Sequence, residues 1–256
     1  MPALLLRKII TWSQEHLLPW ALFLGIWQGL SLLFPVPSAV KVLGLALADT
    51  SSPRIASALA GSLSRMVIGF SMVVALGVPL GLLIGRIRLL DNLLGTLASA
   101  LNAMPGAAWV PLAIFLFGLN QKAVIFTIVL GATGIVMQST SAGVREVPTI
   151  ILQAARTMGA KGWKIFWYTI LPAATPRVLE GLRLAWAFGW RALMAGELLI
   201  TTVNGMGRLI SEVSKQRDME QLLAYMVIIA LIGMTVDNLI FNRLLGDRIR
   251  RRWGTA

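Results

Sequence analysis

The sequence lacks cysteine altogether and has a single histidine, His16. Disulfides and thiolate metal sites are therefore excluded, and one histidine cannot form a metal-binding cluster. Charged residues are also scarce, at 13% of the 256 residues against about 25% in soluble proteins, whereas 57% are hydrophobic. So few charges cannot build a water-soluble surface, and much of this surface must face lipid.

Long apolar segments run through the whole chain. A helix needs about 20 apolar residues to cross a hydrocarbon core about 30 Å thick. Segments near this length occur at residues 17–34, 63–85, 93–117, 122–143, 176–200 and 221–243. No small-residue cleavage site follows the first segment, so we expect it to be retained rather than removed as a signal peptide. The sequence predicts an all-α integral membrane protein with about six transmembrane helices, in one domain spanning residues 1–256.

The net charge of +12 has two interpretations. In a soluble protein it would suggest nucleic acid, whereas in a membrane protein the cytoplasmic loops are basic. With the N-terminus inside, 15 of the 23 lysines and arginines fall on the inner side and 8 on the outer side. We therefore expect a multi-pass protein with both termini in the cytoplasm, no nucleic-acid partner, and a basic tail, Arg248–Arg252, held at the anionic inner leaflet.

Glycine and proline mark two of the predicted spans. The second span carries glycines four or eight residues apart, at Gly69, Gly77, Gly81 and Gly85. This spacing puts them on one helix face, where they allow close packing against another helix, while Pro79 is expected to kink the span.

The third span contains Asn102, Pro105, Gly106 and Pro111. Two prolines and a glycine should break its hydrogen-bond ladder, and broken membrane helices often line a pathway. A structural kink alone is the alternative.

Residues 145–175 form the longest polar-rich loop. Apolar side chains recur there at three- and four-residue spacing, which predicts a short helix with one apolar face. These side chains are Ile150, Ile151, Ala154, Ala155 and Met158. Gly159 suits a left-handed helix end, and a second apolar stripe begins at Trp163. The loop is either an amphipathic hairpin on the membrane surface or a protrusion that docks into a partner.

This loop resembles the EAA loop of permeases in binding-protein-dependent ABC importers. The pattern there is Glu-Ala-Ala, three residues, Gly, nine residues, then Ile-x-Leu-Pro. The matching positions are Ala154, Ala155, Gly159, Leu171 and Pro172. Two positions depart, because Gln153 replaces the Glu and Thr169 replaces the Ile. Loss of the Glu charge is expected to weaken a polar contact with the partner without removing the hairpin.

The rest of the chain is similar to the nitrate, sulfonate and taurine branch of these permeases. The segments that carry this similarity are Ser62–Phe70, Gly77–Gly85, Pro105–Pro111, Gly181–Glu197 and Asn204–Gly207. The resemblance implies a type I ABC importer permease fold in a bacterial cytoplasmic membrane. It also implies import of a small anionic solute, whose identity the sequence leaves open.

The resemblance also implies partners. Two permease copies, as a homodimer, would form the pathway, and an extracytoplasmic binding protein would deliver the solute. Cytoplasmic ATPase subunits would receive the coupling residues Ile151, Gln153, Ala154, Ala155, Met158, Gly159, Leu171 and Pro172. The chain has no G-x-x-x-x-G-K-[ST] loop, so ATP and Mg²⁺ would be bound by the ATPase. We expect no catalytic residues, cofactor or metal in this chain.

Charged residues at membrane depth usually face a cavity or a partner. Arg65, Arg191 and Glu197 are therefore pathway candidates, together with Asn102 and Pro105; a structural ion pair or snorkelling is the alternative for the charged three. Asp237 is expected to pair with the nearby Arg243. A self-contained secondary transporter or channel is the rival function, but it would need coupling-ion residues and often an internal repeat. A membrane scaffold, the other rival, would not need two broken spans.

Overall fold

The computed structural model describes residues 2–239 and 241, with the backbone alone for residues 2–17. This part of the chain is helical throughout and contains no strand. Its α-helices are α1 (Pro2–Leu33), α2 (Ala39–Asp49), α3 (Pro53–Arg86), α4 (Arg88–Leu90), α5 (Thr96–Ala103), α6 (Val110–Phe117), α7 (Gln121–Arg145), α8 (Thr149–Thr157), α9 (Trp163–Ile165), α10 (Leu171–Leu199), α11 (Met206–Gln216) and α12 (Met219–Val236). Single turns of other helix types join them at η1 (Asp91–Gly95), η2 (Gly106–Trp109) and η3 (Phe166–Ile170).

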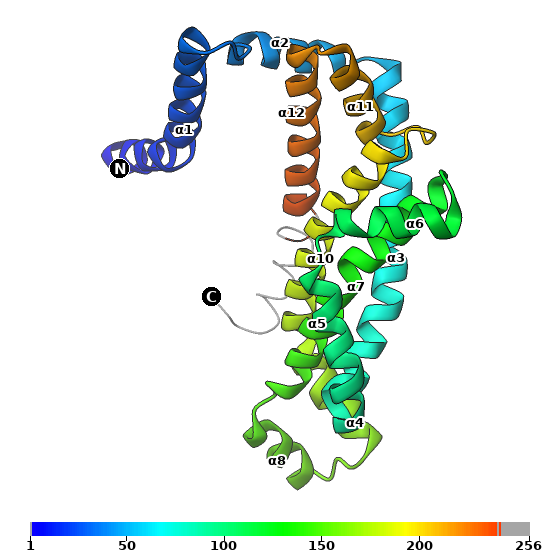
Figure 1. The fold of residues 1–256 in the computed structure, drawn as a ribbon. Coiled ribbons are helices and arrows are strands. Elements are labelled where there is room, and N and C mark those ends of the chain that lie inside the picture. The colour runs from blue at the N-terminus through cyan, green and yellow to red at the C-terminus, as the bar shows by residue number, and fades with distance from the viewer. Residues whose placement is uncertain (1, 240, 242–256) are drawn as a thin grey trace.

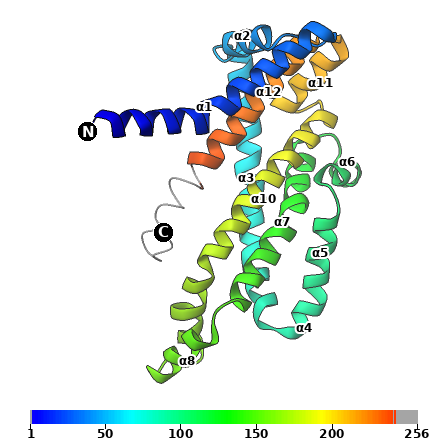
Figure 2. The same cartoon turned by 90° about the vertical axis from the view of Figure 1, so that its left-hand side faces the viewer.

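Helices α3, α7 and α10 run side by side along the length of the molecule, with α5 beside them (Figures 1 and 2). Helices α2 and α11 lie at one end, and α8 lies at the other. We call these the α11 end and the α8 end.

Each predicted span coincides with a helical segment. Among the described residues, α3, α7 and the segment Met219–Leu239 are long and apolar enough to cross a membrane alone, and the bent pair Arg88–Ala103 and Gly106–Phe117 makes a fourth. Helix α1 contributes a shorter apolar stretch, Leu18–Leu33. Helix α10 has 29 residues but carries five charged side chains. The last residues of the sixth predicted span and the basic tail lie outside the described residues.

The glycine face of the second span packs against α7, as predicted. A Cβ atom added at Gly77 would lie 2.7 Å from Val136 Cβ, and one at Gly81 would lie 2.6 Å from Thr140 Cβ. At Gly85 the corresponding distance to Val144 Cβ is 2.7 Å. These distances leave no room for a side chain, so the glycines allow the two backbones to approach. Helix α3 continues through Pro79 to Arg86.

The third span is broken where Pro105 and Gly106 predicted a break. Helix α5 ends at Ala103, Met104 is extended, and the axis turns by 102° before α6. A Cβ at Gly106 would lie 2.9 Å from Ala192 Cβ, so the break packs tightly against α10. Pro111 occupies the first turn of α6, where its missing N–H removes no helix hydrogen bond.

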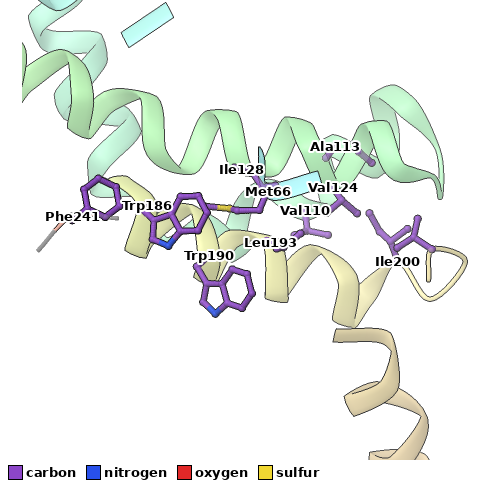
Figure 3. Close-up of a cluster of buried hydrophobic side chains, with 12 residues drawn as sticks. Met66, Val110, Ala113, Val124, Ile128, Trp186, Trp190, Leu193, Ile200 and Phe241 are labelled. Carbon is purple, nitrogen blue, oxygen red and sulfur yellow. The ribbon is translucent and has the colours of Figure 1, made fainter. Parts of the chain in front are cut away.

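The main core lies where α3, α7 and α10 meet (Figure 3). Met66, Ile128 and Leu193 are fully buried there, and Trp186 and Trp190 extend the cluster along α10. A second cluster joins α2, α11 and α12 at the α11 end. The loop that carries α8 contributes to neither cluster.

Candidate functional site

Helix α8 is the most exposed helix of the predicted coupling loop. It begins directly after Pro148 and projects from the α8 end, away from the core (Figures 1 and 2). None of its residues is buried. The side chain of Ile150 is 71% exposed and that of Met158, at its C-terminal end, is 88% exposed. Among the described residues of this helix, only Leu152 and Ala155 are partly buried, so most of its apolar face is uncovered.

The end of α8 has the left-handed backbone that Gly159 predicted. Gly159 has φ +85° and donates its N–H to the Arg156 carbonyl at 3.0 Å. Ala160 donates to the Ala155 carbonyl at 3.0 Å, which closes the helix end. Gly162 is a second glycine with a positive φ, +54°, which the sequence did not predict. Its signal was its place directly before the second helical stretch.

The second half of the loop is tied to the membrane helices. Phe166 is buried, stacks with Trp163 and Trp167, and lies under the Arg86 guanidinium, 5.0 Å from the ring centre. Arg86 is the last residue of α3. The exposed helix α8 is therefore followed by a segment, residues 163–170, that is held against α3. We call this segment the anchored base.

The predicted coupling residues fall into two groups. Leu171 and Pro172 open α10 at the base of the loop and are partly buried. The others belong to α8 or its end, where Ile151, Gln153, Ala154, Met158 and Gly159 are exposed and Ala155 is partly buried. At the base, Arg177 on α10 pairs with Glu180 at 2.9 Å and with Glu146, just after α7, at 3.7 Å. The Arg177–Glu146 pair joins the two ends of the loop, whereas the Arg177–Glu180 pair lies within α10.

Among the pathway candidates, Arg65 and Glu197 form one buried ion pair. Arg65 donates to Glu197 Oε1 from Nε at 3.1 Å and from Nη2 at 2.6 Å. The two residues are 5% and 0% exposed. Glu197 Oε2 accepts from the Ser62 hydroxyl at 2.8 Å and from the Gly207 amide at 3.0 Å. Because the two charges pair with each other and Glu197 accepts further hydrogen bonds, the pair can be stable away from water.

This pair joins three elements near the α11 end. Arg65 lies on α3, Glu197 lies on α10, and Arg65 Nη2 also donates to the Asn204 carbonyl at 2.7 Å. A Cβ at Gly205 would lie 2.3 Å from Glu197 Oε2, so the turn before α11 fits closely against the pair. For Arg65 and Glu197, this geometry matches the alternative interpretation, a structural ion pair, rather than a pathway role.

The remaining charged candidates lie elsewhere. Arg191 is exposed on α10, with its guanidinium carbon 5.2 Å from the centre of the Phe188 ring. Asp237 accepts two hydrogen bonds from Arg183, at 2.8 and 2.6 Å. Arg243, the partner expected for Asp237, lies outside the described residues.

Asn102 belongs to a polar contact between α5 and α7 that sequence reasoning did not foresee. Its Nδ2 donates to Gln138 Oε1 at 2.7 Å, and Gln138 Nε2 donates to Ser99 Oγ at 2.9 Å. Pro105 follows at the break beyond α5. The only signal in the sequence was the isolated amide of Gln138 inside the apolar span 122–143.

The all-α fold, the exposed loop and the broken span all agree with one known family of proteins. Residues 77–251 match the family model described as "Binding-protein-dependent transport system inner membrane component". The chain belongs to this permease family.

Curated relatives agree with this membership. The permease is 38% identical over 176 residues to a putative ABC transporter permease of Methanocaldococcus jannaschii, covering 69% of this chain and 66% of the relative. It is 31% identical to the bicarbonate transport system permease of Synechococcus elongatus, covering 70% and 64%. It is 30% identical to the taurine transport system permease of Escherichia coli, covering 70% and 65%. The matches thus span slightly under two thirds of these relatives, and they confirm the resemblance to the nitrate, sulfonate and taurine branch.

A solved structure shows the same fold. The permease aligns with a chain of the inward-facing MetNI methionine ABC transporter at a TM-score of 0.62 and 16% identity, covering 79% of this chain and 98% of that one. The predicted all-α importer permease fold is therefore confirmed.

Proposed function

We propose that this permease is the membrane-spanning subunit of an ATP-driven importer for a small anionic solute such as nitrate, a sulfonate or taurine. An external binding protein supplies the solute, and separate cytoplasmic ATPase subunits bind ATP and Mg²⁺ and supply the energy. The observation that carries the proposal is α8, an uncovered apolar helix on an anchored base. The bicarbonate and taurine permeases among its relatives support the solute class.

Coupling would take place at α8. Its face with Ile151, Ala154 and Ala155 has small to medium side chains that fit a groove, and Ile150 and Met158 extend the exposed apolar surface. Burying the side chain of Ile150, Ile151 or Met158 in a partner would stabilise the complex by roughly 1.5–3 kcal/mol. Leu171 and Pro172 would carry movement of the docked helix into α10. Gln153 supplies a neutral hydrogen-bonding group at this surface.

This role sets the orientation of the molecule. The α8 end would face the cytoplasm, where ATP is available, and we expect both termini to be cytoplasmic as well. The α11 end then faces outward and receives the solute from the binding protein. The pathway itself would form between two copies of this chain in a homodimer.

The pathway candidates would divide into two roles. Asn102 and Pro105, beside the broken span, would line the pathway. Arg191 would line it too, because it is exposed and Glu197 pairs with Arg65 instead. Arg65 already binds a carboxylate inside the same chain, so we infer that it and Glu197 hold the frame rather than contact the solute. To gain that arginine, a solute would have to replace the two hydrogen bonds from Arg65 to Glu197.

The test of coupling uses Gly159→Val and Ala155→Asp. A β-branched residue fits φ +85° poorly, so Gly159→Val should distort the end of α8 and leave the membrane helices intact. Ala155→Asp places a charge in the docking face. Both variants should insert normally, lose copurification with the ATPase, and lose ATP-driven uptake in liposomes.

Gly25→Val is the matched control, because Gly25 lies in α1 with nothing within 4 Å of an added Cβ and without a positive φ. It should bind the ATPase like the unchanged protein. If both loop variants keep full ATPase association and full uptake, α8 is only a surface hairpin. Uptake that needs no ATPase would instead indicate a secondary transporter or channel.

A further inference from the structure

The polar contact between α5 and α7 is exposed, although it lies within two predicted spans. Ser99 and Gln138 are exposed, and Asn102 is half-buried. Their hydrogen bonds form a chain in which Asn102 donates to Gln138 at 2.7 Å, Gln138 donates to Ser99 at 2.9 Å, and Ser99 donates to the Gly95 carbonyl at 3.0 Å. We call these three side chains the amide chain.

The amide chain is held at membrane depth. Gln138 lies seven residues before the end of α7 at Arg145, which is about 10 Å of helix. Gly134 lets α5 approach α7 at this level, since a Cβ there would lie 2.6 Å from Asn102 Oδ1 and 2.8 Å from the Ala98 carbonyl. Exposed amides at this depth do not face hydrocarbon, because their remaining hydrogen bonds would be lost there.

The exposed surface of α3 shows what a lipid-facing surface looks like in this chain. Most exposed residues of α3 in its span are apolar, among them Val67, Ile68, Met72, Leu76 and Leu83. The exposed hydroxyls of Ser64 and Ser71 donate to carbonyls of the helix itself. The contrast with the amide chain indicates that α3 faces lipid, whereas the α5–α7 face lies against water or protein.

A cleft beside the amide chain indicates that the α5–α7 face contacts water rather than protein. A cleft of about 540 Å³ is lined by Ser99 and Gln138 at one end and by Asn92, Thr96 and Arg145 towards the α8 end. A tightly packed protein interface would have to fill this volume. Arg145 is paired with Asp91, so the positive charge in the lining is already compensated.

From this geometry we propose that the amide chain is a solute-contacting site in the transport pathway, and that it holds an oxyanion with neutral N–H donors rather than with an arginine. Among the described residues, each amide group donates one of its two N–H bonds, so Gln138 and Asn102 each keep one donor for a solute oxygen. Contacts without a fixed cation are weak enough to let an anion leave again, as conduction requires. The inference rests on the proposed import of an anion.

The chain has no cysteine, so accessibility can be measured with single cysteines. The permease would be reconstituted with its ATPase and binding protein, and Ser99→Cys would be treated with a charged, membrane-impermeant thiol reagent. Met72→Cys, on the lipid-facing surface of α3, is the matched control. We expect Ser99→Cys to react and Met72→Cys to stay unmodified.

The solute contact is tested by uptake of labelled taurine, nitrate and bicarbonate. Gln138→Leu should lower uptake about tenfold, the size expected for one lost hydrogen bond to a charged group, without loss of assembly. Gln138→Glu should abolish uptake of the anion while ATP hydrolysis continues. Gln121→Leu, at the exposed start of the same helix, should leave uptake unchanged.

Four outcomes would overturn the proposal. An unreactive Ser99→Cys would place this face against lipid, and an unreactive one that cross-links to its copy would place it in the interface between two permeases. Normal uptake by Gln138→Leu would remove the solute contact. If the unchanged importer took up none of the three solutes, the proposed solute class would fail and the solute role of the amide chain with it. Labelling of Ser99→Cys would still show whether the face is water-filled.

Discussion

The α3–α7 contact and the loop that carries α8 both depend on glycine, but for opposite reasons. At Gly77 and Gly81 the backbone is ordinary helix, and a side chain would collide with α7 at 2.6–2.7 Å. At Gly159 and Gly162 there is nothing within 4 Å of an added Cβ, and the backbone is left-handed instead. The first pair is needed for space and the second for conformation.

The difference separates two kinds of damage. A substitution in the α3–α7 contact pushes two membrane helices apart and so threatens the whole fold. A substitution in the loop changes the direction in which a short exposed helix points. The packing of α3 against α7 would therefore determine whether the permease folds, and the loop would determine whether it binds its partner.

The largest expected effect is that of Gly81→Leu. Overpacking typically costs about 1–3 kcal/mol where neighbours can shift. Here the Met137 carbonyl would lie 2.7 Å from the new Cβ, and backbone atoms of a packed helix have little freedom to move. We expect the cost to exceed that range and folded protein to be lost, as measured by the yield of monodisperse permease in mild detergent.

Gly25→Leu is the control for size and hydrophobicity, since the space beside Gly25 is open. Its yield should match that of the unchanged permease. Normal folding of Gly81→Leu would show that α3 and α7 are less tightly packed than the Cβ distances indicate, and the comparison between the two glycine pairs would fail.

A somewhat smaller effect is expected from removing one partner of the buried ion pair. Arg65→Met or Glu197→Met should each destabilise the permease by about 3–5 kcal/mol, because the remaining charge is buried without compensation. The double variant should be more stable than either single variant, since it buries no unpaired charge. Thermal unfolding in detergent measures all three. If the double variant is as unstable as the two single effects added together, the residues do not act as a pair.

In the loop, Met158→Ser should leave stability unchanged and weaken partner binding. The side chain is 88% exposed, so the fold loses nothing when it is removed. If α8 docks into the ATPase, the dissociation constant of that complex should rise about tenfold, within the range expected for one lost apolar side chain. Met219→Ser, exposed at the start of α12, is the control and should change neither property. Equal binding by both variants would place the docking surface elsewhere.

The features predicted correctly from the sequence depend on local spacing. The glycine face of α3 repeats every four residues, the break after α5 follows from proline and glycine chemistry, and the left-handed end of α8 needs one glycine after an apolar stripe. Each of these is determined within about ten residues of chain. Periodicity and backbone preference are sufficient to find them.

The features that were missed depend on contacts between distant segments. Arg65 and Glu197 are separated by 132 positions, and Asn102 and Gln138 by 36. Which of several intramembrane polar residues meet is decided by how the helices pack, and packing leaves no periodic signal. Asp237 illustrates this, because its observed partner is Arg183 on another helix rather than a neighbour in sequence.

The outer surface of the α11 end offers an exposed counterpart to the buried ion pair. Glu212 on α11 accepts from Arg208 Nε at 2.7 Å and from Arg54 Nη2, at the start of α3, at 2.5 Å. The hydrogen bond from Arg208 is the main cause that lowers the pKa of Glu212 below its ordinary value of 4.5, and the charge and hydrogen bond of Arg54 add to it. Partial burial of the carboxylate opposes this shift.

The smallest expected effect is therefore that of Glu212→Gln. Because the pKa of Glu212 is lowered in the folded state, its contribution to stability is present above about pH 4.5 and is lost as the pH falls through the folded pKa. Exposed ion pairs contribute at most roughly 1 kcal/mol and are screened by salt. In thermal unfolding at pH 7 the variant should melt slightly below the unchanged permease, and the gap should narrow towards acidic pH and in high salt. A gap that stays constant under both conditions would mean that Glu212 stabilises α11 by packing, as the buried residues do, rather than by its charge.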